Sequence, residues 1–133
     1  VVENVGATRG SVFETGGIRE SLKLKEWFDK NFSLLKRQAE STSHHLTMKK
    51  IDVRLVGKSV YVRFYYDTQD AMGLNMVTIA TSALVLLIEQ KTKAKCISVA
   101  GNFDIDKKPA WLNFISGRGS PFLVYLTLNL SFK

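Results

Sequence analysis

Residues 70–75 of the chain, DAMGLN, have types and a spacing that suit ligand binding. They follow an aromatic, strand-like run and open an apolar, helix-like run. Asp70 is a good helix N-cap, because its carboxylate accepts hydrogen bonds from backbone N–H groups of the first turn. Gly73 and Asn75 are poor helix formers, so another role must account for them.

Two interpretations account for Gly73. A position without a side chain lets a phosphate approach the backbone N–H groups of a helix N-terminus, where the Asn75 amide can donate to the same ligand. Alternatively, a tight contact between helix and sheet needs a small residue at Gly73. The spacing alone leaves both interpretations open.

A second stretch whose residues could take part in a reaction covers residues 98–119, SVAGNFDIDKKPAWLNFISGRG. Asp106, Lys107 and Lys108 follow one another there, directly before Pro109. A lysine ammonium beside an aspartate can stabilise negative charge that develops on a carbonyl oxygen, without transferring a proton itself. The same three residues are also typical of an ordinary solvated turn.

Composition limits the classes of protein and partner. The chain has 133 residues, of which 45% are hydrophobic, and this suits one domain with a real core. Its net charge of +7 favours an anionic partner: nucleic acid, a phosphorylated cofactor or an acidic membrane surface. The single cysteine, Cys96, predicts a buried thiol in a reducing compartment and no metal site. The most apolar stretch, 83–88, is far shorter than the roughly 18 residues of a membrane span, so we expect a cytoplasmic protein without membrane association.

The elements that must position these residues follow from hydrophobic periodicity. We expect strands at 5–14, 51–55, 60–66 and 94–100, and helices at 24–39 and 71–90. Gly57 and Lys58 form the hairpin turn between the second and third strands. This order predicts an α+β, ferredoxin-like β-α-β-β-α-β fold, with a four-stranded antiparallel sheet that carries two helices on one face. Because this fold hosts many functions, the sites must identify the activity.

Several blocks of the sequence resemble one enzyme family. DAMGLNM and AGNFDIDKKPAWLNFISGRG, with ATRG upstream and STSHH between them, occur in the order found in class I hydroxymethylglutaryl-coenzyme A (HMG-CoA) reductase. The family patterns read close to T-G-D-A-M-G-M-N-M and S-G-N-x-x-x-D-K-K-P, and the match looks archaeal. The resemblance implies a small NADPH-binding domain over residues 1–119, followed by a divergent tail over 120–133. It agrees with the missing G-x-G-x-x-G fingerprint of Rossmann folds.

The resemblance assigns roles residue by residue. Lys107 matches the catalytic lysine that stabilises the oxyanion during thioester reduction. Asp106 and Lys108 match residues that shape the hydroxymethylglutaryl pocket, and Arg9 matches an arginine that binds the substrate carboxylate. The residues that fall on the cofactor segments are Ser43, His44, His45, Asp70, Ala71, Met72, Gly73, Leu74 and Asn75. Without the resemblance, His44 and His45 would be surface histidines and Arg9 an ordinary strand arginine.

Three departures from the family pattern bear on the expected function. His44 and His45 stand where the family commonly has Arg-Phe after the serine, and that arginine faces the extra phosphate of NADPH. A neutral histidine holds a phosphate less well than an arginine, so we expect a weaker or pH-dependent cofactor preference. Ala100 replaces a substrate-binding serine, and Gln69 replaces the glycine before Asp70.

The resemblance also implies partners: the substrate HMG-CoA, the large domain of the same enzyme and a homo-oligomer whose active site forms between subunits. Reduction to mevalonate needs a further glutamate, aspartate and histidine that cannot be placed in this chain, so we expect it to be inactive alone. Nucleic acid is not expected as a partner.

Two alternatives come from other classes of function. In a basic RNA-recognition module, Tyr61, Arg63 and Tyr65 of KSVYVRFYY would stack on bases. Against this alternative, the segment lacks the glycine pattern of that module's long motif. The second alternative is a regulatory domain that senses a small molecule, and only the predicted fold supports it.

Overall fold

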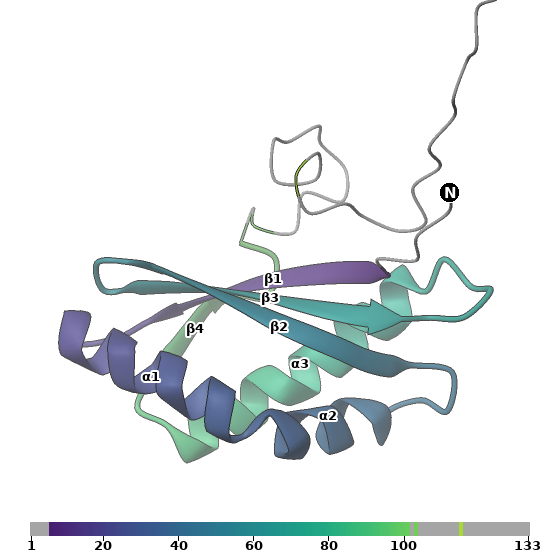
Figure 1. The fold of residues 1–133 in the computed structure, drawn as a ribbon, viewed down its shortest axis with the longest axis horizontal. Helices are drawn as coiled ribbons and strands as arrows, with labels where there is room; N and C mark the ends of the chain where they lie inside the picture. The colour runs from purple at the N-terminus through teal and green to yellow at the C-terminus, as the bar shows by residue number, and fades with distance from the viewer. Residues whose placement is uncertain (1–5, 102, 104–114, 116–133) are drawn as a thin grey trace, which may run out of the picture.

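The computed structural model describes residues 6–101, 103 and 115, and these form one sheet with helices packed against a single face (Figure 1). The elements are β1 (Ala7–Glu14), α1 (Ile18–Lys30), α2 (Phe32–Glu40), β2 (Thr47–Val56), β3 (Ser59–Asp67), α3 (Leu74–Lys91) and β4 (Lys95–Ser98). The strand order is β2-β3-β1-β4, and every pairing is antiparallel. The predicted α+β, ferredoxin-like fold is confirmed.

The first predicted helix is interrupted at Asn31. The backbone N–H of Asn31 and its side-chain amide both donate to the carbonyl oxygen of Trp27, at 3.0 and 2.8 Å, and so close the last turn of α1. The apolar stripe continues across the break, because Phe28 on α1 and Leu35 on α2 are both buried. The two short helices therefore bury the same apolar stripe as the single helix that the periodicity predicts.

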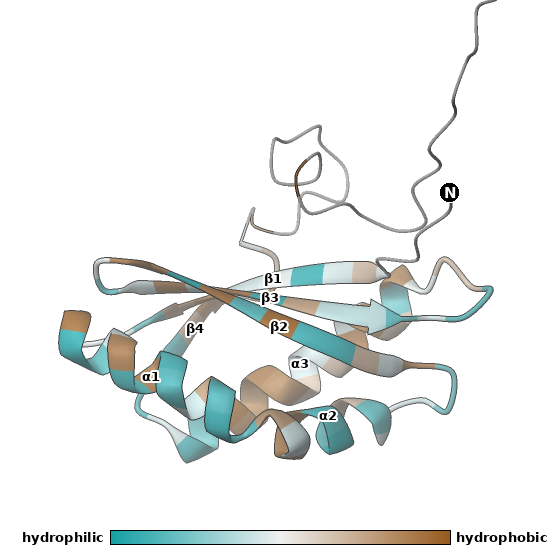
Figure 2. Ribbon diagram, viewed as in Figure 1, coloured by the Kyte–Doolittle hydropathy of each residue, from teal (hydrophilic) through white to brown (hydrophobic). Residues whose placement is uncertain are grey.

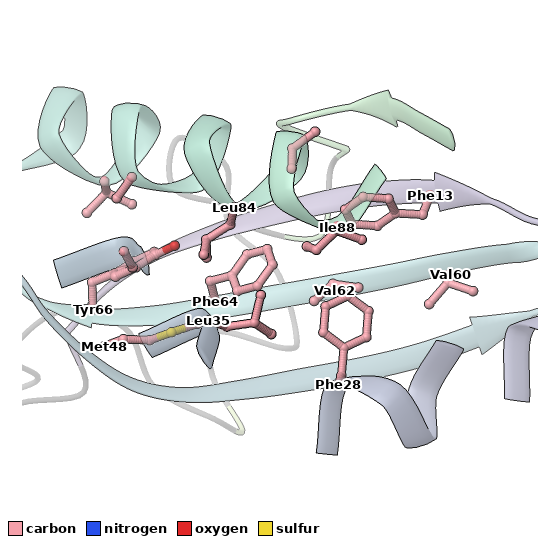
Figure 3. Close-up of a cluster of buried hydrophobic side chains, with 14 of the residues drawn as sticks. Phe13, Phe28, Leu35, Met48, Val60, Val62, Phe64, Tyr66, Leu84 and Ile88 are labelled. Carbon is pink, nitrogen blue, oxygen red and sulfur yellow. The ribbon is translucent and has the colours of Figure 1, made fainter. Parts of the chain in front are cut away.

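The core lies between the sheet and the helices. Alternate residues of β3 face the helices and are fully buried: Val60, Val62, Phe64 and Tyr66. The rings of Phe28 and Phe64 meet edge to face, with their centroids 6.4 Å apart, and Figure 3 shows both side chains in this layer. Burial of each such side chain stabilises the fold by about 1.5–3 kcal/mol.

Helix α3 is apolar on more than its core side (Figure 2). Leu84 and Ile88 are fully buried, whereas Ile79 and Leu86 are 62% and 61% exposed. Among the described residues, no helix has both the length and the apolar character needed to cross a membrane.

A polar pair inside the core joins β3 to α3. The hydroxyl groups of Tyr66 and Thr81 lie 2.9 Å apart, and both residues are fully buried. Burial raises the pKa of the Tyr66 phenol far above its usual value. The folded state therefore holds this proton at pH values where the unfolded chain has released it.

This proton gives a testable pH dependence. The unfolded phenol titrates near pH ~10, so above that pH the unfolded state binds fewer protons than the folded state and the free energy of unfolding falls. We expect Tyr66→Phe to cost about 1 kcal/mol at neutral pH through the lost hydrogen bond, and to reduce the fall in stability above pH ~10. Urea unfolding between neutral and alkaline pH measures both effects. Parallel curves for the two proteins would contradict the assignment to Tyr66.

Candidate functional site

The loop between β3 and α3 is built around the buried Thr68. Its hydroxyl donates to the carbonyl oxygen of Ala71 at 2.7 Å, and the Ala71 N–H donates to the carbonyl oxygen of Thr68 at 3.2 Å. The N–H of Gln69 donates to the Asp67 carboxylate at 3.0 Å. These bonds fix the backbone that carries the first half of the predicted cofactor segment 70–75.

Gly73 has a structural role that neither interpretation of the sequence names, because it caps α3. Helix α3 begins at Leu74, with Gly73 as its N-cap in the left-handed conformation at φ 64°. A Cβ on Gly73 would lie 2.5 Å from Cγ2 and 2.6 Å from Cβ of Thr68. The predicted N-cap role of Asp70 is wrong, because Asp70 is exposed in the turn before Gly73. Gly73 meets a close neighbour, as one interpretation required, but that neighbour belongs to the loop and not to the sheet.

The N-terminus of α3 presents hydrogen-bond donors at the end of this loop. The first bond of the helix runs from the Val77 N–H to the carbonyl oxygen of Gly73, at 2.9 Å. The N–H groups of residues 74–76 precede it, so they have no acceptor within the helix. Asn75 is exposed beside them. Such a helix start favours an anionic ligand.

The loop that follows α2 carries Ser43, His44 and His45. The His45 N–H donates to the Ser43 hydroxyl oxygen at 3.2 Å, and both histidines are exposed. An open hollow of about 420 Å³ adjoins this loop, with Ser43 and His44 in its lining. The loop therefore offers a hydroxyl and two imidazoles to a ligand at the surface.

The structure brings the two predicted cofactor segments together. Nδ1 of His45 lies 3.3 Å from Oε1 of Gln69, the residue directly before Asp70. Among the described residues, Gln69 is the one non-glycine with a positive φ, at 54°. Gln69 is not among the residues that the sequence predicts for the site. Its signal was present, because Gln69 occupies a glycine position of the family pattern.

Arg9 lies at the same end of α3. It faces the helices from β1, opposite Phe64 in the register, and its Nη2 donates to the Thr78 hydroxyl at 2.6 Å. Thr78 in turn donates to the carbonyl oxygen of Leu74 at 2.8 Å. An arginine and the N-terminus of α3 are thus held together through one threonine.

The segment that leads to the predicted catalytic lysine starts beside Arg9. The Gly101 N–H donates to the carbonyl oxygen of Gly10 at 2.7 Å, and the Ser11 hydroxyl donates to that of Val99 at 3.1 Å. Asp106, Lys107 and Lys108 lie outside the described residues. Their predicted roles stay predictions.

The face of the sheet opposite the helices does not favour the RNA-binding alternative. Arg63 and Tyr65 are 0% and 1% exposed, so their side chains are not available to stack on bases. The Tyr61 ring contacts that of Phe103, with a centroid distance of 5.9 Å. Within the described part of the chain, no group of three or more histidine, cysteine or acidic residues is arranged to hold a metal ion.

Comparison of the sequence with known proteins identifies the family to which it is similar. The family model described as "Hydroxymethylglutaryl-coenzyme A reductase" matches residues 1–129. The chain is 42% identical over 127 residues to 3-hydroxy-3-methylglutaryl-coenzyme A reductase of Halobacterium salinarum, covering 96% of this chain and 31% of the relative. It is 45% identical over 122 residues to the enzyme of Methanothermobacter thermautotrophicus, covering 91% of this chain and 31% of the relative. The chain thus spans about a third of the length of the curated relatives that it matches.

A solved structure supports the fold. The class II 3-hydroxy-3-methylglutaryl-CoA reductase from Streptococcus pneumoniae, bound to NADPH in open conformations, matches with a TM-score of 0.66 and 16% identity. The match covers 80% of this chain and 31% of that one. At this identity the likeness concerns the fold alone.

Proposed function

Because this chain belongs to the hydroxymethylglutaryl-coenzyme A reductase family, we propose that it forms the NADPH-binding domain of an enzyme that reduces 3-hydroxy-3-methylglutaryl-CoA to mevalonate and CoA. One observation carries the proposal. The two segments that match the family's cofactor segments, together with Arg9, converge on the N-terminal end of α3. The β2–β3 hairpin makes the two loops neighbours, and Arg9 adds a cation at the same end of α3, so an anionic ligand would meet all three.

The donor set at this end of α3 suits NADPH. Backbone N–H groups of residues 74–76, the Asn75 amide and the Ser43 hydroxyl would hold phosphate oxygens, and the exposed Asp70 carboxylate would accept from a ribose hydroxyl. The histidines would lie near the extra phosphate. NADPH supplies the hydride when bound, and the domain's own task is to bind and orient it.

On the substrate side, two cations would act on different oxygens. The ammonium group of Lys107 would stabilise the negative charge that develops on the thioester carbonyl oxygen. The guanidinium of Arg9 would hold the substrate carboxylate through paired hydrogen bonds. Asp106 and Lys108 would shape the pocket around the hydroxymethylglutaryl group.

The rest of the catalytic machinery would come from the larger part of the enzyme. The chain covers 31% of the Halobacterium salinarum reductase, so a large domain that contacts this one is expected to supply the remaining acid–base groups. An oligomer whose active site lies between subunits would complete the site. We therefore expect the 133-residue chain alone to show no HMG-CoA-dependent oxidation of NADPH.

An NADPH titration of the chain followed by amide NMR tests the binding role. We expect saturable shifts at Gly73, Leu74, Asn75 and His45, because these residues border the proposed site. Asn75→Ala should weaken binding about tenfold to a hundredfold through one lost hydrogen bond to a charged group, with the unfolding temperature nearly unchanged because Asn75 is exposed.

A parallel titration with single-stranded RNA separates the alternatives. Absence of any NADPH response would contradict the cofactor role. Shifts at Tyr61, Arg63 and Tyr65 on addition of RNA would favour the RNA-binding module instead. Measurable thioester reduction by the chain alone would contradict its dependence on a large domain.

A further inference from the structure

A second hollow lies at the end of α3 that is remote from the cofactor loops. It has a volume of about 340 Å³ and lies between α1 and the turn that joins α3 to β4 (Figure 1). Helix α3 has 18 residues and so spans about 27 Å, which separates this hollow from the α3 N-terminus. Volumes of this size are typical of small-molecule sites. We propose that the hollow binds a nucleoside phosphate, a role that does not depend on the proposed function.

The apolar part of the lining includes an aromatic ring. Leu24 and Ala94 line the hollow and are buried. The Trp27 indole lines it too and stays partly exposed. Its ring meets that of Phe28 edge to face, with centroids 5.6 Å apart, and Phe28 is buried in the core. A partly exposed indole that packs against the core offers a fixed surface on which a planar base can stack.

Three lysines give the hollow its charge. Lys23 on α1, Lys91 at the end of α3 and Lys93 in the following turn line it, and all three are exposed. Within the described part of the chain none of the three forms an ion pair, whereas Lys58 pairs with Glu14 at 2.6 Å. Ammonium groups that no carboxylate neutralises suit a phosphate, which lysine binds as a point charge.

The remaining charges near the hollow leave it positive. The one acidic residue in its lining is Glu20, whose carboxylate accepts from the Gly16 N–H at 2.7 Å. Three lysines against this carboxylate leave an excess of two positive charges. The C-terminal end of α3 carries partial negative charge, but the N–H and the hydroxyl of Thr92 both donate to the carbonyl oxygen of Ile88, each at 2.8 Å. The electrostatics of the hollow therefore favour an anion.

The hydroxyl groups in the lining are already engaged. The Thr15 hydroxyl lies 3.0 Å from the carbonyl oxygen of Lys58 and 2.7 Å from the Ser21 hydroxyl, and that of Thr92 bonds to Ile88. Neither is left to distinguish one base from another. We therefore expect ADP and GDP to bind with affinities within about threefold of each other, and adenosine, which lacks the phosphates, to bind at least about tenfold more weakly.

Fluorescence of Trp27 tests the proposal on the 133-residue chain. The chain has two tryptophans, so Trp111→Phe leaves Trp27 as the single indole. We expect ADP to change its emission saturably, with a dissociation constant below about 1 mM, because the base stacks on the ring. Absence of saturation in this range would overturn the proposal.

Charge and ring variants, measured by calorimetry, separate the two parts of the site. Lys23→Gln should weaken ADP binding about threefold, and its combination with Lys91→Gln and Lys93→Gln at least about tenfold. Lys25→Gln, at an exposed lysine of α1 outside the lining, is the matched control and should keep the wild-type affinity. Trp27→Leu should weaken ADP binding about fivefold or more and leave the affinity for inorganic phosphate unchanged.

Amide NMR locates the ligand and completes the test. We expect ADP to shift the signals of Lys23, Trp27 and Thr92. Shifts confined to Gly73 and Asn75 would place ADP at the cofactor end of α3 and overturn the proposal, as would an unchanged affinity in the triple lysine variant. Equal affinities for ADP and inorganic phosphate would also overturn it, because the indole would then contribute nothing. A chain that binds ADP here but does not bind NADPH would support this site and contradict the proposed function, so the two proposals fail separately.

Discussion

Replacement of Gly73 with alanine is expected to lower the free energy of unfolding by about 2–4 kcal/mol. Two costs add. The left-handed backbone at φ 64° disfavours any side chain, and the new Cβ would lie 2.5 Å from Cγ2 of the buried Thr68. Thr68 must then move, and its hydrogen bond to Ala71 moves with it. We therefore expect the variant to bind NADPH at least tenfold more weakly even where it is folded.

Gly57 provides the matched control for this change. It has nearly the same φ, 61°, but a Cβ there would meet nothing within 4 Å. Gly57→Ala should therefore cost only the backbone part, about 1–2 kcal/mol, and leave NADPH binding unchanged. Urea unfolding of both variants separates the backbone cost from the contact with Thr68. Equal losses would show that the contact with Thr68 contributes nothing.

Replacement of Lys107 with glutamine, in the longer reductase to which we assign this chain, is expected to lower kcat by about 10²–10³-fold. Glutamine keeps a hydrogen-bond donor but lacks the charge that would stabilise the oxyanion. The KM for NADPH should change little, because the lysine would act on the substrate carbonyl.

The control for Lys107 is a lysine outside the proposed machinery. Lys95 is exposed on β4, and Lys95→Gln removes the same charge from the chain without a role at the site. Its kcat should stay at the wild-type value. A kcat for Lys107→Gln within threefold of wild type would exclude the electrostatic role, and a large rise in the KM for NADPH alone would place the lysine at the cofactor instead.

Much of the fold was predictable because its signals are local and periodic. Alternation along β3 and the stripe from Leu24 to Ala39 each reflect one buried face, and the structure buries those faces. The break at Asn31 was not predictable from this signal, because the stripe keeps its phase across it. It depends on a side-chain amide that reaches the carbonyl oxygen of Trp27.

Prediction failed at the start of α3 for a similar reason. Asp70 has the chemistry of an N-cap, but the left-handed Gly73 sets the first turn three residues later. A sequence does not reveal whether a glycine adopts a positive φ or merely tolerates a helix. The space beside Thr68 decides between these roles, and that space exists only in the folded loop.

The contact of His45 with Gln69 was predictable only in part. The β2–β3 hairpin pairs Thr47 with Asp67, and continuation of this register two residues outward places His45 opposite Gln69. The predicted turn at Gly57 and Lys58 therefore indicates that the two cofactor loops are neighbours, but the register shift between Met48 and Lys50 changes the partner of His45 by one residue. The side-chain contact itself depends on the strained backbone of Gln69, which no pattern predicts.

The hydrogen bond between Gly101 and Gly10 has a consequence for how such a domain can be combined with others. The chain enters the sheet at Ala7, the first residue of β1, and Gly101, after the last strand, is bonded to Gly10 of β1. Ala7 and Gly10 are about 10 Å apart at the rise of a strand, so the points where the chain enters and leaves the sheet are close together. A module whose two junctions are this close can be spliced into a surface loop of a host protein with little distortion of the host. If the domain moved as one body relative to such a host, a ligand bound at the N-terminus of α3 would move with it toward or away from groups that the host supplies.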